Sequence, residues 1–258
     1  MKSSNKAQIQ QAFTQQAAEF ESNRMNFSAQ DYLNSVVQKI APTKTDAVLE
    51  AAAGTCACGR TIAPYAGSVV CLDMTPAMLS VGKSEAGKNH LDNMTFVLGD
   101  AAELPFLNGS FDIVLSRLAF HHFPDVKQPF AEMVRVLKPG GKLVLIDMEA
   151  AEEPLREAED SIEKMRDPSH VRNLSENEML ALYRDSGLSV SCCEVTKMPV
   201  VLQSWLEHTK TPPEIQKQIE TKMLDEINGG RKTGFSPYVH NGELCFDQRR
   251  GLIIGNKK

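Results

Sequence analysis

The stretch that decides the fold reads VLEAAAGTCACG and covers residues 48–59. It predicts a first strand that runs into a turn of small residues and then into a helix. In an open α/β sheet such a turn faces the crevice at the carboxyl ends of the strands, where these folds bind ligands. Small side chains let a ligand lie against the backbone. The turn therefore predicts a ligand site, and the alternative is a tight turn that only packs a helix onto the sheet.

The same turn argues against a nucleotide-phosphate loop. It contains neither G-x-G-x-x-G nor G-x-x-x-x-G-K-[ST], because Gly54 and Gly59 are five residues apart and no lysine follows. Glu50, at the end of the strand, repels phosphate and attracts a cation. We therefore expect a ligand without a pyrophosphate.

Short β-branched runs alternate with helical stretches on the carboxyl side of this turn. The expected strands cover residues 47–51, 68–73, 94–100, 111–118 and 142–148, followed by 188–198 and 244–256. Alternation of this kind is typical of βαβ units and a parallel sheet. The final strand is expected to pair with the one before it.

The helices between the strands carry their own start and stop signals. Thr75 and Pro76 place an N-cap hydroxyl and then a proline at the first helical position. Residues 139–141, Pro-Gly-Gly, stop an apolar helical stripe. Ser175 and Glu178 form a capping box. Helices are therefore expected on both faces of the sheet.

Three parts of the chain lie outside this alternation. Residues 1–41 contain two expected helices, of which the second covers 28–40 and the first carries an apolar stripe of Ile9, Phe13, Ala17 and Phe20. Residues 149–173 and 202–242 are interpreted as lid insertions over one rim, the second containing a helical stretch at 202–228. We therefore expect a single domain, 1–258, with a lid.

Two further strands end in an acidic residue. Asp73 lies 19 residues after Gly54, the spacing at which a carboxylate reaches a ribose diol, although an aspartate there also often caps the next helix. Asp100 and Ala101 follow the third strand, where a carboxylate can accept from an adenine amino group and a backbone N–H can serve a ring nitrogen. Three successive acidic strand ends favour a binding site.

Composition restricts the function classes. Hydrophobic residues make up 42% of the chain and charged residues 24%, which is typical of a globular domain. The longest apolar runs, such as 143–146, are too short to span a membrane, and the polar start 1–11 lacks a secretory signal, so we expect a cytoplasmic protein. The net charge of −5 disfavours nucleic acid as a partner. The six cysteines are interpreted as reduced thiols, with no metal site.

Together these residues resemble the class I S-adenosylmethionine-dependent methyltransferases, in particular the branch similar to enzymes of ubiquinone and menaquinone biosynthesis (methyltransferase type 11). The resemblance covers about 47–187, and its motifs are LEAAAGT at 49–55, LDMTPAML at 72–79, GDA at 99–101, FDIV at 111–114, HHF at 121–123 and VLKPGG at 136–141. It implies an α/β, Rossmann-like fold. The sheet would have seven mostly parallel strands with an antiparallel last strand, helices on both faces and helical lid insertions.

The resemblance also implies S-adenosyl-L-methionine as cofactor and assigns roles to individual residues. These are Glu50, Ala52 and Gly54 at the methionine end, Asp73 at the ribose, Met74 on the adenine face, Asp100 and Ala101 at the adenine edge, and Ser116 near the amino group. The cofactor is a sulfonium cation, so a pocket rimmed by acids suits it. In the family a helix like the first one can close over the cofactor.

The glycine turn departs from the family pattern. The usual Gly-x-Gly-x-Gly reads here Ala52-Ala53-Gly54-Thr55-Cys56 and keeps only the central glycine. Where a position requires a positive φ, a residue other than glycine costs on the order of 1 kcal/mol. We expect weakened but retained cofactor binding.

His121 and His122 follow the fourth strand on the rim where the methyl acceptor is expected. A histidine there can take a proton from an acceptor atom near neutral pH, and His122 is the candidate catalytic residue. The alternative is that the pair only shapes the loop. Positioning alone can supply about 7–11 kcal/mol in an in-line transfer, so a base is not obligatory.

The sequence therefore predicts a methyltransferase that acts on a small-molecule acceptor. Two alternatives remain: a non-catalytic protein that binds S-adenosylmethionine for regulation, and a methyltransferase with a macromolecular acceptor. A nicotinamide-dependent oxidoreductase is disfavoured by the missing G-x-G-x-x-G. No membrane span is expected, and a homodimer is left open. Trp205, Phe235 and Tyr238 either line the acceptor pocket or pack the second insertion onto the sheet.

Overall fold

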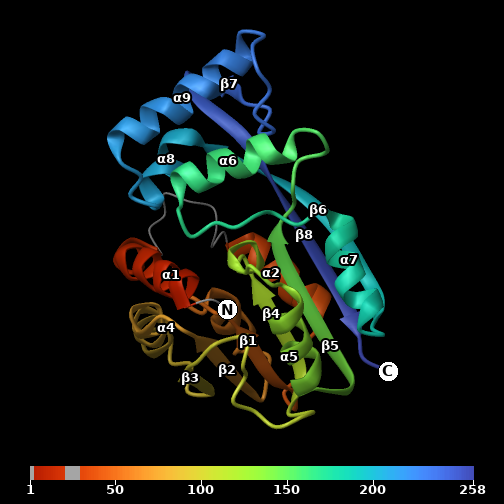
Figure 1. Ribbon diagram of the computed structural model, residues 1–258. Coiled ribbons are helices and arrows are strands. Elements are labelled where there is room, and N and C mark those ends of the chain that lie inside the picture. Colours follow the sequence, from red (N-terminus) through yellow and green to blue (C-terminus); the bar gives the residue numbers. More distant parts are fainter. Residues whose placement is uncertain (1–2, 21–29) are drawn as a thin grey trace.

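The computed structural model describes residues 3–20 and 30–258 (Figure 1). The strands are β1 (Ala47–Ala51), β2 (Ser68–Asp73), β3 (Met94–Leu98), β4 (Phe111–Arg117), β5 (Leu137–Met148), β6 (Ser189–Val201), β7 (Tyr238–His240) and β8 (Glu243–Asn256). The helices are α1 (Ser3–Gln16), α2 (Gln30–Ile40), α3 (Ala57–Ile62), α4 (Pro76–Lys88), α5 (Lys127–Val136), α6 (Arg156–Arg166), α7 (Glu176–Asp185), α8 (Leu202–His208) and α9 (Pro213–Ile227), with short 3-10 turns η1 (Ala17–Glu19) and η3 (Phe120–His122). The expected first residues of the second helix, 28–29, lie outside the described residues.

The strands form one sheet in the order β3-β2-β1-β4-β5-β8-β6. Strands β1 to β5 pair in parallel, and β8 lies antiparallel between β5 and β6. The short β7 pairs with β8 off this path and adds an eighth strand to the seven that were expected. The prediction of a Rossmann-like sheet with an antiparallel last strand is confirmed.

Helices cover both faces of the sheet, as Figure 1 shows. On one face, side chains of β1, β4 and β5 pack with Phe130 and Met133 of α5 and Tyr183 of α7. On the other, they pack with the apolar sides of α2 and α3, which include Val36 and Ile62. Because both faces are covered, the inner strands are almost continuously apolar, as parallel sheets require.

A third apolar core lies beyond one end of the sheet, where β6 and β8 extend past their neighbours (Figure 1). It joins residues of α6, α8 and α9 to Phe246 of β8, around the fully buried Trp205. We call α6, α8 and α9 with these strand ends the cap. The first insertion contributes α6 and the second contributes α8, α9 and β7, so the two expected insertions meet in one core.

Several expected boundaries are wrong for identifiable reasons. The third strand stops at Leu98, before Asp100. Strand β5 begins at Leu137, because residues 139–141 continue it rather than forming a turn outside it, with Gly140 at φ 77° donating to the carbonyl of Lys257. The expected helix 202–228 is divided between α8 and α9, where Lys210 takes φ 53° and two prolines follow.

The expected capping residues have different outcomes. Ser175 and Glu178 form the predicted capping box at the start of α7. Pro76 occupies the first turn of α4 as predicted, but the Thr75 hydroxyl makes no capping hydrogen bond. Instead, the Thr75 backbone N–H donates to Oδ1 of Asp73 at 2.8 Å. Among residues 3–20 and 30–258, no helix is long and apolar enough to cross a membrane.

Candidate functional site

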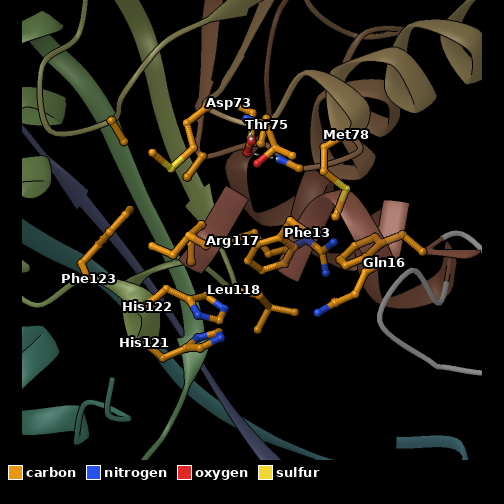
Figure 2. A pocket seen from close by; sticks show the side chains of 18 of the residues that line it. Phe13, Gln16, Asp73, Thr75, Met78, Arg117, Leu118, His121, His122 and Phe123 are labelled. Carbon is orange, nitrogen blue, oxygen red and sulfur yellow. Dashed lines mark hydrogen bonds between the residues drawn. The ribbon is translucent and has the colours of Figure 1, made fainter. Parts of the chain in front are cut away.

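A cavity lies at the carboxyl ends of the parallel strands, beneath α1 and the cap (Figure 2). Its empty space is about 1040 Å³, a volume that includes the part open to solvent. We call one part the strand-end half: Ala52, Ala53, Gly54, Asp73, Met74, Thr75, Met78, Gly99, Asp100 and Ala101. The rest is the cap half: Ile9, Gln16, Phe20, Leu118, Ala119, His121, His122, Phe123, Met148, Arg166, Asp167, His208 and Thr209, with Phe13 and Arg117 between the halves.

The turn after β1 has the backbone geometry of a glycine turn although two glycines are replaced. Ala52, Gly54 and Cys56 all have positive φ, at 53°, 54° and 63°. Each replacement therefore carries strain on the order of 1 kcal/mol, as the sequence predicts. A Cβ on Gly54 would meet nothing within 4 Å, so the central glycine leaves open space.

Cys56 is accommodated by a glycine on a neighbouring helix. Its side chain is fully buried, and a Cβ built on Gly82 of α4 would lie only 2.8 Å from the Cys56 Sγ. The bare backbone of Gly82 thus provides the room for a thiol at this position. The replacement is packed into the fold rather than projecting into the cavity.

Asp73 connects the ends of β1 and β2. Its Oδ2 accepts from the Gly54 N–H at 2.7 Å and its Oδ1 accepts from the Thr75 N–H at 2.8 Å. Burial raises the pKa of this carboxyl, and the two backbone donors oppose that shift. Asp73 therefore fixes the glycine turn and still presents a carboxylate to the cavity wall.

Helix α1 is attached to the strand-end half by two polar contacts. The Lys6 Nζ lies 2.5 Å from Oδ2 of Asp100, and the Gln10 Nε2 donates to the Met74 carbonyl at 2.8 Å. Further along, the Phe13 ring lies edge-on to the His122 ring with centroids 5.1 Å apart. The N-terminal helix therefore closes over both halves of the cavity.

Glu50 and Ser116 do not line the cavity. The buried Glu50 Oε2 accepts from the Gly59 N–H at 2.7 Å and lies behind the turn. Burial raises the pKa of Glu50 to about 7, and nearby Arg117 opposes the shift. The Ser116 hydroxyl is buried without a hydrogen-bond partner among the described residues.

A histidine and a buried aspartate form a pair in the cap half. The His121 Nδ1 lies 2.5 Å from Oδ1 of Asp147. Asp147 is itself held by backbone donors, since its carboxylate accepts from the N–H groups of Phe120 at 2.6 Å and Met148 at 2.7 Å. Burial lowers the pKa of His121, but the Asp147 carboxylate outweighs it and the pKa is raised overall.

His122 has the opposite electrostatic environment. Its Nδ1 lies 3.1 Å from both the carbonyl and the hydroxyl oxygen of Ser169. Burial, and then the neighbouring His121, lower the pKa of His122 to about 3. The two imidazole rings are tilted by 46° to each other with centroids 4.1 Å apart, and Figure 2 shows them side by side on the cavity wall. His122 is therefore a neutral side chain near pH 7.

The cap supplies two charged residues to the same half. Arg166 lies with its guanidinium carbon 4.3 Å from the Trp205 ring centre and donates from Nε to the Trp205 carbonyl at 3.1 Å. Asp167 accepts from the backbone and hydroxyl of Ser169. Trp205 and Phe235 pack in the third core and do not line the cavity, which decides between the two roles expected for them.

Most of the residues singled out from the sequence meet in this cavity. Ala52, Gly54, Asp73, Met74, Asp100, Ala101 and His122 line it, and Glu50 and Ser116 lie behind it. Sequence reasoning missed Asp147, although it ends a parallel strand as Asp73 does. It also missed Arg166 and Asp167, for which no motif gives a signal. Among residues 3–20 and 30–258, no group of three histidine, cysteine or acidic side chains is placed to hold a metal ion.

Comparison with known proteins finds methyltransferases among the relatives of this chain. The family model described as "Methyltransferase domain" matches residues 49–145. An uncharacterized methyltransferase of Bacillus subtilis, YcgJ, is 34% identical over 213 residues, covering 82% of this chain and 84% of the relative. The crystal structure of YcgJ superposes with a TM-score of 0.80 at 30% identity, covering 89% of this chain and 99% of that one.

A demethylmenaquinone methyltransferase of Clavibacter sepedonicus is 30% identical over 173 residues. The match covers 67% of this chain and 68% of that relative. Both matches are far longer than the turn after β1. The resemblance therefore extends beyond the glycine turn.

Proposed function

This chain belongs to the class I S-adenosylmethionine-dependent methyltransferases, and we propose that its methyl acceptor is a small molecule bound in the cap half of the cavity. The methyltransferase activity follows from the family. What the comparisons leave open is the acceptor, because the YcgJ relative is named only as an uncharacterized methyltransferase. The burial of the residues that line the cap half is the observation that carries the proposal.

The strand-end half suits the cofactor. We propose that Asp73 binds the ribose hydroxyls, that Met74 contacts the adenine, and that Asp100 and Ala101 contact the adenine edge. Asp73 keeps acceptor capacity after its two backbone hydrogen bonds, because each carboxylate oxygen has two lone pairs. The open space beside Gly54 leaves room for a ligand against the backbone.

The methionine end of the cofactor is assigned to Ala52 and Gly54 of the turn, with Glu50 and Ser116 behind them. The buried Glu50 carboxyl lies beneath this turn, so a cation above it would favour its ionised form. We propose that the backbone carbonyl of Ser116, at the end of β4, lies near the amino group of the cofactor, while its hydroxyl stays buried behind the cavity. When bound, S-adenosylmethionine supplies an activated methyl group on a sulfonium sulfur.

The cap half suits a small acceptor rather than a macromolecule. Its lining residues His121, His122 and Phe123 are each less than a tenth exposed, and Phe13 of α1 packs against His122. A nucleic acid or protein segment needs an open groove, and the net charge of −5 does not favour a polyanion. The Clavibacter relative is named as a demethylmenaquinone methyltransferase, which agrees with a small acceptor.

In this cavity the chain's main contribution is positioning. Methyl transfer is an in-line displacement on a carbon that is already activated, so holding the acceptor in line can lower the barrier by about 7–11 kcal/mol. We propose that α1 and the cap exclude water and hold the acceptor against the strand-end half. His122, neutral because its pKa is lowered to about 3, contributes as a wall that contacts the acceptor.

The test is release of S-adenosylhomocysteine from S-adenosylmethionine with small acceptors carrying hydroxyl, amine or thiol groups, compared with bulk transfer RNA and protein. Turnover with at least one small acceptor and none with the macromolecules is expected. Turnover with a macromolecule alone would contradict the proposal. Tight binding of the cofactor by calorimetry without turnover of any acceptor would favour the alternative of a regulatory binding protein.

A further inference from the structure

We propose that Nε2 of His121, positioned by Asp147, accepts the proton of the methyl acceptor, and that this acceptor is a phenol methylated on its hydroxyl oxygen. The inference rests on the proposed function, since it names the acceptor class and the proton acceptor of that same cavity. It assigns to His121 the role that the sequence suggests for His122. Asp147 is a positioning residue that does not touch the acceptor.

The hydrogen bonds around Asp147 determine which imidazole nitrogen carries the proton. Its carboxylate receives two backbone N–H groups and faces the His121 Nδ1 at 2.5 Å. An ionised carboxylate only accepts, so the Nδ1 must donate to it. The neutral ring then has its lone pair on Nε2, and the ring lies in the cavity wall. A carboxylate that fixes the tautomer and orientation of a base is a recurring arrangement in enzymes.

The two histidine rings lie 4.1 Å apart, so a charge on one disfavours a charge on the other, and their surroundings select His121. The groups around the pair are Asp147 on β5, Glu163, Arg166 and Asp167 at the end of α6, His170, and His208 at the end of α8. Of the two rings, that of His121 is hydrogen-bonded to Asp147, whereas that of His122 is hydrogen-bonded to Ser169. A proton arriving at the pair therefore goes to His121, and His122 stays neutral.

Ring chemistry in the cap half indicates an aromatic acceptor. Phe13 lies edge-on to His122, Phe20 lies 5.0 Å from His208 between ring centres, and Phe123 completes the wall. Offset and edge-on aromatic contacts stabilise a planar ring bound among them. A phenol has an ordinary pKa of about 10, close enough to that of a histidine for proton transfer as the oxygen is alkylated.

The proton and charge balance of the step is complete without an added co-reactant. The phenol O–H bond breaks, its electron pair stays on oxygen, and the proton goes to Nε2 of His121. The new C–O bond forms from an oxygen electron pair as the methyl–sulfur bond breaks and its pair stays on sulfur. The reaction thus removes the positive charge from sulfur and leaves one on the protonated His121, where the Asp147 carboxylate stabilises it. The proton then leaves His121 to solvent.

Histidine NMR tests the assignment without turnover. Protein labelled with ¹⁵N-histidine and saturated with S-adenosylhomocysteine is titrated, and the His121 and His122 signals are assigned with His121→Gln and His122→Gln. We expect neutral His121 with its proton on Nδ1 and a titration above that of an ordinary histidine, while His122 remains neutral throughout. A proton on Nε2 of neutral His121, or titration of His122 above His121, would overturn the proposal.

Turnover of mono-, di- and polycyclic phenols tests the role itself. We expect kcat to fall at least 10²-fold in His121→Gln and less than tenfold in His122→Gln, with S-adenosylhomocysteine affinity retained in both. In Asp147→Asn the acidic limb of the pH–rate profile should move to lower pH, which a purely structural role would not cause. An equal loss in the two histidine variants would overturn the role of His121.

A failure of the phenols can be separated from a failure of the proposed function. If the wild type methylates amines or thiols but no phenol, the phenol inference is wrong and the small-molecule function stands. If it methylates no small acceptor, both are wrong. If Asp147→Asn does not bind S-adenosylhomocysteine, its fold is altered, and the comparison of His121→Gln with His122→Gln decides the proposal.

Discussion

The strand-end half of the cavity is made by residues 52–54, 73–78 and 99–101, whereas the cap half takes its residues from α1, η3, α6 and α8, between Ile9 and Thr209. In the first, backbone N–H groups and a few carboxylates at consecutive strand ends define the shape. In the second, side chains from distant segments meet only because the third core holds the cap together. The first half can therefore stay constant across a family while the second changes with the acceptor.

This difference predicts that a mutation in the third core weakens acceptor binding more than cofactor binding. Trp205→Ala empties a fully buried site that contacts Phe235, Phe246 and Arg166. We expect the cap to lose about 3–5 kcal/mol of stability in urea unfolding, and acceptor KM to rise more than cofactor affinity falls. Tyr65→Ala, at a half-exposed aromatic residue away from the cap, is the control. An equal loss of affinity for the acceptor and for the cofactor would contradict this distinction between the two halves.

The matching change in the strand-end half is Asp73→Ala. It leaves the N–H groups of Gly54 and Thr75 without their acceptor and removes the carboxylate proposed for the ribose. We expect S-adenosylhomocysteine to bind about 100-fold more weakly, close to 2.7 kcal/mol by calorimetry. Asp46→Ala, which removes an aspartate that accepts the Thr43 N–H before β1, should leave the affinity unchanged. Unaltered binding in Asp73→Ala would contradict the assigned role.

Glu50 should make the strand-end half sensitive to pH. Its pKa is about 7 in the folded protein because of burial, against 4.5 ordinarily, so between these values the folded state holds a proton that the unfolded state has lost. The contribution of Glu50 to the free energy of unfolding is therefore complete below pH 4.5 and is lost as the pH rises through 7. Between pH 5 and pH 8, the free energy of unfolding of Glu50→Gln should therefore rise by roughly 1–3 kcal/mol relative to that of the wild type.

Thermal unfolding at several pH values measures this effect, with and without cofactor. Because a cation favours the ionised carboxyl, S-adenosylmethionine should stabilise the wild type more at pH 8 than at pH 5.5. In Glu50→Gln this dependence should be weaker. Parallel curves for the two proteins would show that Glu50 does not titrate in this range.

The smallest effect concerns the replaced glycines. Ala52 has φ 53° and lines the cavity, so Ala52→Gly should relieve strain and raise the free energy of unfolding by about 0.5 kcal/mol after the entropy of the unfolded glycine is subtracted. Cys56→Gly relieves similar strain but empties a buried site against Gly82, so it should destabilise. Denaturant unfolding compares both with Ala53→Gly, where no positive φ is relieved and a loss of about 0.5–1 kcal/mol is expected.

The strand-end residues were predictable because parallel strands that begin on one side of a sheet end on the same edge. Asp73 and Asp100 follow that rule, and so does Asp147, which was missed because the expected strand ended one residue later at Met148. The role suggested for His122 illustrates the limit. Two adjacent histidines are equivalent in a sequence. Only the tertiary structure places the Asp147 carboxylate against His121, which raises its pKa, and buries His122 beside His121, which lowers the pKa of His122.

The sequence by itself determined the order of strands and helices, the glycine turn with its positive φ values, and the family. These depend on local patterns: hydrophobic period, cap and turn residues, and the spacing of acids from glycines. The tertiary structure alone decided that Ile9 and Thr209 share a cavity, that Trp205 packs in a core instead of lining it, and which histidine faces a carboxylate. Such contacts join segments far apart in the chain, and side-chain packing of the whole fold selects them.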